Sequence, residues 1–233
     1  MRLYAIGDLH LSGGDDKPMD IFGSQWNRHF FHISEHWRST VTESDTVLIP
    51  GDISWAMHLE DAVHDLEEIA RLPGEKILCK GNHDYWWNSI TRIRAVLPSS
   101  MTALQHNAVD LGSCVVCGTR GWVFDTASQP LDEQDRKICF RELQRLRLAL
   151  EEAKKKAGNR PVIVMMHYPP LLAGETDTPF TRLLEEFHVH TTVYGHLHGQ
   201  GIENGFTGGH NGVRYMLVSC DSIDFSPKEI QLP

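Results

Sequence analysis

The chain has 233 residues, of which 22 are Lys or Arg and 31 are Asp or Glu, so its formal net charge is −9. Apolar residues make up 41% and charged residues 23% of the sequence, a globular composition that excludes collagen-like, disordered and disulfide-dense chains. The negative charge argues against binding long nucleic acid by charge alone. It does not argue against a nucleotide substrate, because bound cations can reverse the local sign.

We expect no secretory signal from the N-terminal sequence. Its first apolar run, residues 3–6, is too short for a signal peptide and is soon followed by Asp8. No stretch approaches the ~18 apolar residues that a membrane span needs. The five cysteines are scattered and odd in number, which suits a reducing compartment. We therefore expect a cytoplasmic protein with no membrane partner.

Short apolar runs alternate with helical patterns over the first 97 residues. Each run is followed by a glycine-containing turn, which favours a buried strand, and each helical pattern places apolar residues three or four positions apart. The predicted strands are residues 3–6, 46–49 and 76–79, and the predicted helices are residues 26–37, 59–70 and 86–97.

In the middle of the chain, several short apolar runs follow one another with turns between them. This spacing is typical of hairpins and predicts antiparallel pairing. The runs are residues 101–104, 109–111, 114–117 and 122–124. Beyond them, the pattern predicts helices at 131–156 and 180–187 and strands at 161–166, 191–194 and 213–218.

The pattern as a whole is that of a layered α/β protein with a large sheet component. We expect two sheets packed face to face with helices on the outside. Neither an internal repeat nor a Pro/Ser-rich linker divides the sequence, so we expect one domain over residues 1–233.

Cys114 and Cys117 are spaced like a metal-binding or redox pair. In a strand, however, residues three apart point to opposite faces of the sheet. The second cysteine pair that a zinc site would need is absent. We therefore interpret this run as a buried strand.

Polar side chains that bind metals or transfer protons follow the predicted strands. The carboxyl ends of strands meet at one edge of an α/β sheet, where such folds bind ligands. Each short motif alone is common in turns, but five of them occur here in order. The residues are Asp8, His10, Asp52, Asn82, His83, Asp84, His167, His196 and His198.

The donor types in this set indicate a site for two transition-metal ions. Carboxylate, carboxamide and imidazole groups suit Mn, Fe, Zn or Co better than Ca, which prefers oxygen ligands alone. Two Asp oxygens, one Asn oxygen and four His nitrogens from this set give seven ligands. Seven ligands are too many for one tetrahedral zinc, and they suit two ions that share a carboxylate. On an extended loop, residues two apart point the same way, so we expect Asp8 and His10 to hold one ion.

These motifs, from Asp8-x-His10 to Gly195-His196-x-His198, resemble the ordered signature of the calcineurin-like metallophosphoesterases. The resemblance spans residues 3–198. The segment from Leu9 to Trp26, with Lys17-Pro18-Met19 and Phe22-Gly23, further resembles a bacterial branch of predicted phosphohydrolases. The family implies a four-layer αββα sandwich of two mixed β-sheets flanked by helices.

The resemblance also implies a role for each residue. Asp8, His10 and His198 would hold one metal, Asn82, His167 and His196 the other, and Asp52 would bridge both. A metal-bridging hydroxide would attack phosphorus in line, and His83 would protonate the leaving oxygen as general acid.

Two positions depart from the pattern of many relatives. Trp55 stands where an Asp usually orients the acid histidine, so we expect Asp84 or another carboxylate to take that catalytic role. Ala56 stands where the Ser/Thr protein phosphatases carry a phosphate-clamping Arg, which argues against an enzyme of that type. Arg120 is a candidate replacement clamp or a surface arginine of a hairpin.

Trp55, Trp86 and Trp87 flank the metal motifs and would either wall the substrate pocket or pack beneath it. The leading hypothesis is thus a two-metal phosphoesterase, a phosphatase or phosphodiesterase that acts on a small phosphate ester such as a nucleotide. Two alternatives are a non-catalytic, protein-binding scaffold on the same fold, and a nuclease. The net charge of −9 and the absence of a Lys/Arg stripe disfavour a nuclease that binds long DNA.

Overall fold

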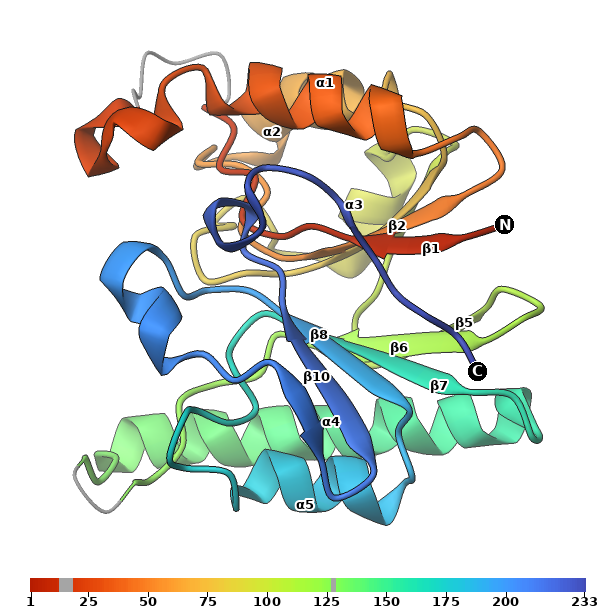
Figure 1. The fold of residues 1–233 in the computed structure, drawn as a ribbon, viewed down its shortest axis with the longest axis vertical. Coiled ribbons are helices and arrows are strands. Elements are labelled where there is room, and N and C mark those ends of the chain that lie inside the picture. Colours follow the sequence, from red (N-terminus) through yellow and green to blue (C-terminus); the bar gives the residue numbers. More distant parts are fainter. Residues whose placement is uncertain (13–18, 127–128) are drawn as a thin grey trace.

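The computed structural model describes residues 1–12, 19–126 and 129–233 of the chain. Two β-sheets stack face to face, and helices cover the outer face of each, which gives four layers (Figure 1). Both sheets are mixed, and the expected α/β sandwich is confirmed.

The first sheet has five strands in the order β11-β1-β2-β3-β4. All neighbours are parallel except β11, which runs antiparallel to β1. The strands are β1 (Leu3–Ala5), β2 (Thr46–Pro50), β3 (Glu75–Cys79), β4 (Met101–Ala103) and β11 (Lys228–Glu229). Its outer helices are α1 (His29–Thr40), α2 (Leu59–Ala70) and α3 (Ile90–Val96).

The second sheet has six strands in the order β5-β6-β7-β8-β10-β9, with an antiparallel strand at each edge. The strands are β5 (Ala108–Asp110), β6 (Val115–Thr119), β7 (Val162–Met166), β8 (Thr191–Tyr194), β9 (Gly208–His210) and β10 (Val213–Leu217). Helices α4 (Glu133–Ala157) and α5 (Pro179–Glu186) cover its outer face. Short 3-10 helices are η1 (Met19–Phe22), η2 (Ser24–Trp26), η3 (Gly199–Asn204) and η4 (Cys220–Ile223).

Successive side chains of each strand enter different cores, as the two-residue period of a strand requires. Leu3 and Ala5 of β1 lie in the core between the sheets, whereas Tyr4 lies in the core beneath the helices of the first sheet. Cys114 and Cys117 divide in the same way, between the inter-sheet core and the core under α4. Both are free and buried, so the interpretation as a buried strand is confirmed.

Several predicted elements differ from the structure. Residues 122–124 do not form a strand, and the Trp122 indole N–H donates to Asp135 on α4. β4 joins β3 in parallel instead of forming a hairpin. The third helix begins at Ile90 rather than residue 86, because the preceding loop is held by contacts described below.

Two further observations bear on the sequence predictions. Residues 17 and 18, which carry part of the branch resemblance, lie outside the described residues. Among the helices that the structure describes, none is both long and apolar enough to cross a membrane.

Candidate metal centre

The polar residues predicted from the sequence converge at one edge of the sandwich. Asp8, Asp52 and Asn82 follow β1, β2 and β3 of the first sheet. His167 follows β7 of the second sheet, and His196 and His198 follow β8. The carboxyl ends of the parallel strands in both sheets therefore supply the same site, as α/β topology favours.

One group of ligand atoms lies around Asp8. The Nε2 atom of His198 is 3.3 Å from Asp8 Oδ1 and 3.4 Å from His10 Nε2. Ligand atoms of these three residues lie within 4.8 Å of one another, close enough to share one ion. Asp52 Oδ2 lies 3.8 Å from His10 Nε2 and so borders this group.

A second group lies around Asn82. Its Oδ1 atom is 2.6 Å from His167 Nε2 and 2.9 Å from His196 Nδ1. Asp52 Oδ2 is 3.4 Å from His167 Nε2, so the Asp52 carboxylate borders both groups. The seven side chains thus form two adjoining groups. Asp8 borders the second group as well, since ligand atoms of Asp8, Asp52 and His167 lie within 4.8 Å of one another.

A hydrogen bond on the far side of the His167 imidazole leaves a lone pair of that ring facing the cluster. His167 Nδ1 lies 3.0 Å from the Pro50 carbonyl oxygen, which can only accept, so His167 donates from Nδ1. Its Nε2 then carries a lone pair directed at the oxygens of Asn82 and Asp52. Acceptors that face one another repel unless a cation or a proton lies between them. The donor set therefore fits divalent metals, with neutral imidazoles and carboxylates as ligands.

The two buried carboxylates perturb each other strongly. Burial and then the charge of Asp8 raise the pKa of Asp52 to about 8. Burial also acts to raise the pKa of Asp8, but a hydrogen bond from His198 and three nearby imidazoles lower it below its usual value. The cluster thus concentrates negative charge away from water, an environment that a cation stabilises.

The imidazoles are perturbed in opposite directions. Burial lowers the pKa of His196 to about 4, with His167 adding to the effect. Burial also acts to lower the pKa of His198, but hydrogen bonds to Asp221 and Asp8 outweigh it and raise the pKa to about 10. Asp221 accepts from His198 Nδ1 at 2.8 Å, which directs Nε2 toward the cluster.

The backbone at the site lies in the left-handed region at four non-glycine residues. The φ angles are 59° at Asp8, 46° at His10, 50° at Asp52 and 75° at His196. Each such residue costs on the order of 1–3 kcal/mol, and such strain gathers at functional sites. The expectation of an extended loop at Asp8 and His10 was wrong, since the turn itself brings the two side chains to one place.

Two glycines leave room for the carboxylates. A Cβ atom on Gly81 would lie 2.1 Å from Asp52 Oδ1, and a Cβ atom on Gly195 would lie 2.2 Å from Asp8 Oδ2. Any side chain at either position would displace the carboxylate. Glycine is therefore required here for close approach rather than for flexibility.

His83 lies beside the cluster without joining either set. Its backbone N–H donates to Asp52 Oδ1 at 2.8 Å, and its ring lies 4.3 Å from that of Trp55, centroid to centroid. Its Nδ1 atom is buried and has no hydrogen-bond partner among the described residues. Burial and the nearby His167 lower its pKa.

Asp84 does not orient His83, contrary to the sequence prediction. Its carboxylate is fully buried and accepts from the backbone N–H groups of Ile53, Ser54 and Gly81 and from the Trp86 indole. Asp84 therefore fastens the loop after β2 to the loop after β3. The ring of Trp55 instead packs against His83 in a tilted arrangement, with an angle of 47° between the two ring planes.

The structure places the three candidate substrate contacts, Trp55, Trp86 and Arg120, in different surroundings. Trp86 is fully buried in the core beneath the site and cannot touch a substrate, so that expectation was wrong. Trp55 lines a 280 Å³ cavity above the cluster, together with Trp26 and His83. Arg120 lines a different cavity, and its guanidinium lies 3.6 Å from Glu142, so it is no clamp at the cluster.

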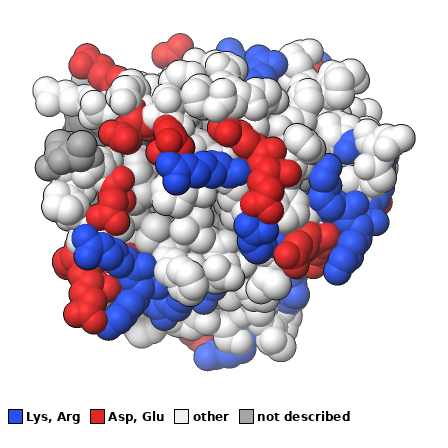
Figure 2. Space-filling view, turned by 90° about the horizontal axis from the view of Figure 1, so that it is seen from below, with Lys and Arg blue, Asp and Glu red and all other residues white. Residues whose placement is uncertain are grey.

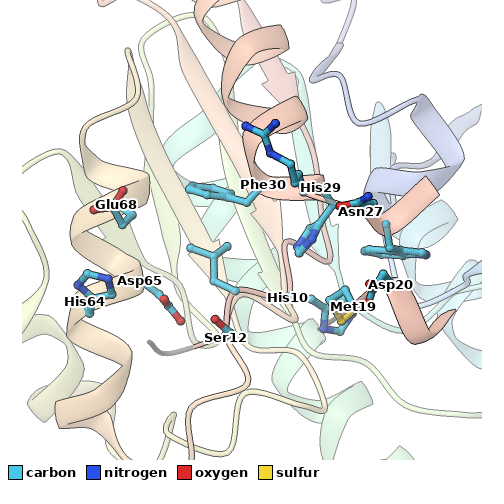
Figure 3. A pocket seen from close by; sticks show the side chains of 13 residues that line it. His10, Ser12, Met19, Asp20, Asn27, His29, Phe30, His64, Asp65 and Glu68 are labelled. Carbon is cyan, nitrogen blue, oxygen red and sulfur yellow. The ribbon is translucent and has the colours of Figure 1, made fainter. Parts of the chain in front are cut away.

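Two larger cavities adjoin the cluster. A 440 Å³ cavity between α1 and α2 also reaches His10, with His64 and Asp65 of α2 facing His29 across it (Figure 3). A 430 Å³ cavity on the other side reaches His196 and is lined by aromatic side chains of Trp122 and Tyr168. The centre is therefore open to molecules larger than phosphate.

Sequence reasoning missed Asp221 and Tyr168. Asp221 follows β10 at the same edge of the sandwich, so its position after a strand is the signal that identifies it. Tyr168 directly follows His167, and its ring lies 4.2 Å from that of His196. An aromatic residue next to a ligand carries no motif of its own.

Comparison with known proteins agrees with this geometry. Solved structures of similar fold include a phosphopantetheinyl hydrolase (PptH) from Mycobacterium tuberculosis, at 14% identity and a TM-score of 0.59. They also include AQ665, a protein of unknown function from Aquifex aeolicus, at 13% identity and a TM-score of 0.51. Each comparison covers 98% of this chain and 95% of the other, whereas no curated protein matches.

At these identities the likeness is one of fold. A family model described as calcineurin-like phosphoesterase, however, matches residues 1–200. This match spans most of the chain and includes every residue of both ligand sets. The chain therefore belongs to the calcineurin-like phosphoesterases and is a metal-dependent phosphoester hydrolase.

Proposed function

We propose that this chain hydrolyses a phosphomonoester or phosphodiester bond of a small substrate such as a nucleotide. The observation that supports the proposal is the convergence of seven metal-binding side chains into two adjoining groups, both bordered by Asp52. Asp8, His10 and His198 would hold one divalent ion, and Asn82, His167 and His196 the other. Mn, Fe or Zn would suit these donors.

When bound, such a pair of ions supplies positive charge to the phosphate oxygens and lowers the pKa of a water molecule. The remaining steps fall to the protein. His83 is the proposed proton donor to the leaving oxygen, supported by its position on the cavity beside both ligand sets. Trp55 and Trp26 line that cavity and would contact a bound substrate.

We propose that residues 1–233 act as one domain. The inter-sheet core draws on both halves of the chain, with Leu48 and Ile77 on one side and Ile163 and Val193 on the other. β11, near residue 229, also pairs with β1 near residue 4. We further propose a cytoplasmic location, in keeping with the five free cysteines.

The surface charge favours a small substrate over long nucleic acid. On the face shown in Figure 2, Lys and Arg side chains alternate with Asp and Glu instead of forming a continuous basic stripe. The net charge of −9 acts in the same direction. A compact phosphate ester needs no such stripe, because the metals would supply the charge that binds it.

The test is a hydrolysis screen of the metal-loaded chain, with aryl phosphomonoesters, aryl phosphodiesters, nucleotides and a phosphopantetheinyl ester side by side. We expect Mn-stimulated cleavage of at least one substrate. Asp52→Asn should lower kcat by about a hundredfold or more, because it removes the shared ligand of both sets. Asp177→Asn changes an exposed carboxylate that pairs with Arg182, and this control should retain full activity.

Metal analysis of the same samples separates this function from the scaffold alternative. A chain that binds metal stoichiometrically but cleaves no ester in the screen would contradict the proposed hydrolase. Substoichiometric metal in every preparation would favour a scaffold.

A further inference from the structure

A separate cavity lies beside the metal centre, and cationic side chains dominate its lining. Its volume is about 180 Å³, and Lys80, Arg120 and Arg145 line it together with Glu142 and Trp87. None of the seven proposed metal ligands is among the residues that line it. The cavity is therefore distinct from the centre described above.

The charges on this lining do not cancel. Three cations, Lys80, Arg120 and Arg145, face one carboxylate, Glu142, which leaves 3 − 1 = +2. Glu142 is already well satisfied, because it accepts from Arg145 at 2.6 Å and from the Thr119 hydroxyl. Arg120 lies farther from it, at 3.6 Å. An excess of positive charge in a partly closed cavity attracts an anion.

Hydrogen-bond donors at the cavity also lack partners. The Nε atom of Arg120 and the Nε1 atom of Trp87 are buried and make no hydrogen bond to any described residue. Trp87 itself is only 2% exposed. Buried donors are seldom left unsatisfied, and an unpaired one costs about 1–3 kcal/mol. Gln105 Oε1 of the same lining is likewise buried without a hydrogen-bond partner among the described residues. A bound group that accepts from the two donors and carries one proton for Gln105, as monohydrogen phosphate does, would satisfy all three.

We propose that this cavity binds a tetrahedral oxyanion such as phosphate. A guanidinium presents N–H groups in a planar fork that matches phosphate oxygens, and the Lys80 ammonium adds a point charge. Lys80 donates one hydrogen bond, to the Trp87 carbonyl at 2.8 Å, which leaves two of its protons for a ligand. The cavity is below the ~300–1,000 Å³ of sites for whole drug-sized molecules, so it suits an isolated anionic group.

The oxyanion can arrive free in solution or as an anionic group on a larger molecule. In both cases the chemistry recognised is the same, namely a tetrahedral group with charged oxygens. The site stands apart from the proposed hydrolysis, since it requires neither metal nor turnover.

The test is calorimetric titration of the full-length chain with inorganic phosphate, before and after treatment with a chelator. We expect a phosphate site that survives the chelator, because it contains no metal ligand. Arg145→Gln and Lys80→Gln should each weaken it about tenfold or more, through the loss of a charged donor. Arg141→Gln, one helical turn before Arg145 and outside the cavity lining, is the matched control and should bind as the unaltered chain does.

The two variants separate loss of the site from misfolding. Because Lys80 and Arg145 lie on different segments of the chain, one substitution that disturbs folding leaves the other as an independent test. Binding that is abolished by the chelator, or that is unchanged in both Lys80→Gln and Arg145→Gln, would overturn the proposal. A second titration, with a bulky phosphomonoester present, identifies the source. If the phosphomonoester competes with inorganic phosphate, the site accepts an anionic group carried by a larger molecule. If it does not compete, the site binds free phosphate. Both results support an oxyanion site.

Discussion

At the scale of single residues, the candidate centre depends on groups that do not themselves point into it. Asp221 uses both of its carboxylate oxygens, one for His198 Nδ1 at 2.8 Å and the other for the Gly199 backbone N–H at 3.0 Å. This pair of bonds fixes the ring of His198 and the loop that follows it. Partners of this kind orient metal-binding imidazoles and raise their basicity.

Replacing Asp221 should therefore weaken metal binding although the residue is not a proposed ligand. Asparagine has only one accepting oxygen, so Asp221→Asn loses one of the two bonds and the negative charge. We expect a loss of about 10–100-fold in metal affinity, measured by competition with a coloured chelator. Asp224→Asn, at an exposed position three residues later, should leave the affinity unchanged. Equal affinities in both variants would contradict a positioning role for Asp221.

A substitution at Gly195 tests how closely the backbone packs against the Asp8 carboxylate. In Gly195→Ala the new Cβ atom would meet Asp8 Oδ2 at 2.2 Å, so the carboxylate has to move from its bonds to the His196 backbone N–H. We expect metal binding to be lost while the far-ultraviolet circular dichroism stays that of the unaltered chain. Gly209→Ala places a Cβ atom in open space and serves as the control. A metal content in Gly195→Ala equal to that of Gly209→Ala would show that Asp8 is not held as described.

The sequence predicted that the side chains of both proposed ligand sets lie together, because each follows a strand within a short ordered motif. It failed where a side chain acts through burial. Asp84 and Trp86 lie beside the motif residues in the sequence, but they bond to each other beneath the site. Asp221 was missed because the single aspartate after β10 belongs to no recognised motif. Spacing along the chain reports which loops meet, but not which side chains of a loop face inward.

At the scale of elements, strands of four or five buried residues were predicted from the sequence, whereas the short edge strands β9 and β11 were not. The strands β2, β3, β7 and β8 are buried almost throughout and lie within a residue or two of their predicted bounds. β11 is only two residues long and has a glutamate in it, and its partner β1 lies at the opposite end of the chain. Its pairing therefore leaves no local pattern.

Asp45 joins two elements of the first sheet. It accepts from the backbone N–H of Arg2, just before β1, and from the N–H and hydroxyl of Thr42, after α1. Burial acts to raise its pKa, but these bonds and the charge of Arg2 outweigh burial and lower the pKa to about 2. A carboxyl whose pKa is lowered on folding stabilises the fold above its unfolded value, near 4, and loses that contribution as the pH falls toward 2.

We therefore expect Asp45→Asn to lower the free energy of unfolding by about 1–3 kcal/mol at pH 7. The difference from the unaltered chain should shrink as the pH falls from about 4 toward 2, because the native carboxyl then also becomes neutral. Urea unfolding at several pH values measures this difference. Glu43→Gln, in the same turn but exposed, should show a small difference that does not change in this way. A constant cost for Asp45→Asn at every pH would exclude an ionic contribution.

At the scale of the whole molecule, the two sheets meet along one apolar core, and both deliver ligands to the same edge. Asp8, Asp52 and Asn82 come from one sheet, and His167, His196 and His198 from the other. The fold was predicted from the alternating pattern of strands and helices and from the family resemblance that the ordered motifs carry. The division of the ligands between the sheets means that bound metals would tie one sheet to the other.

Metal removal should therefore lower the stability of the entire domain. A ligand at 100 times its Kd stabilises the native state by about 2.7 kcal/mol, and in a domain of this size each kcal/mol moves Tm by roughly 2–4 °C. We expect a chelator to lower Tm by about 5–11 °C from its value in saturating Mn. In Asp52→Asn, which loses the ligand bordering both sets, most of this shift should disappear. A Tm that is indifferent to metal in the unaltered chain, or a shift of equal size in Asp52→Asn, would show that no cation links the two sheets through this carboxylate.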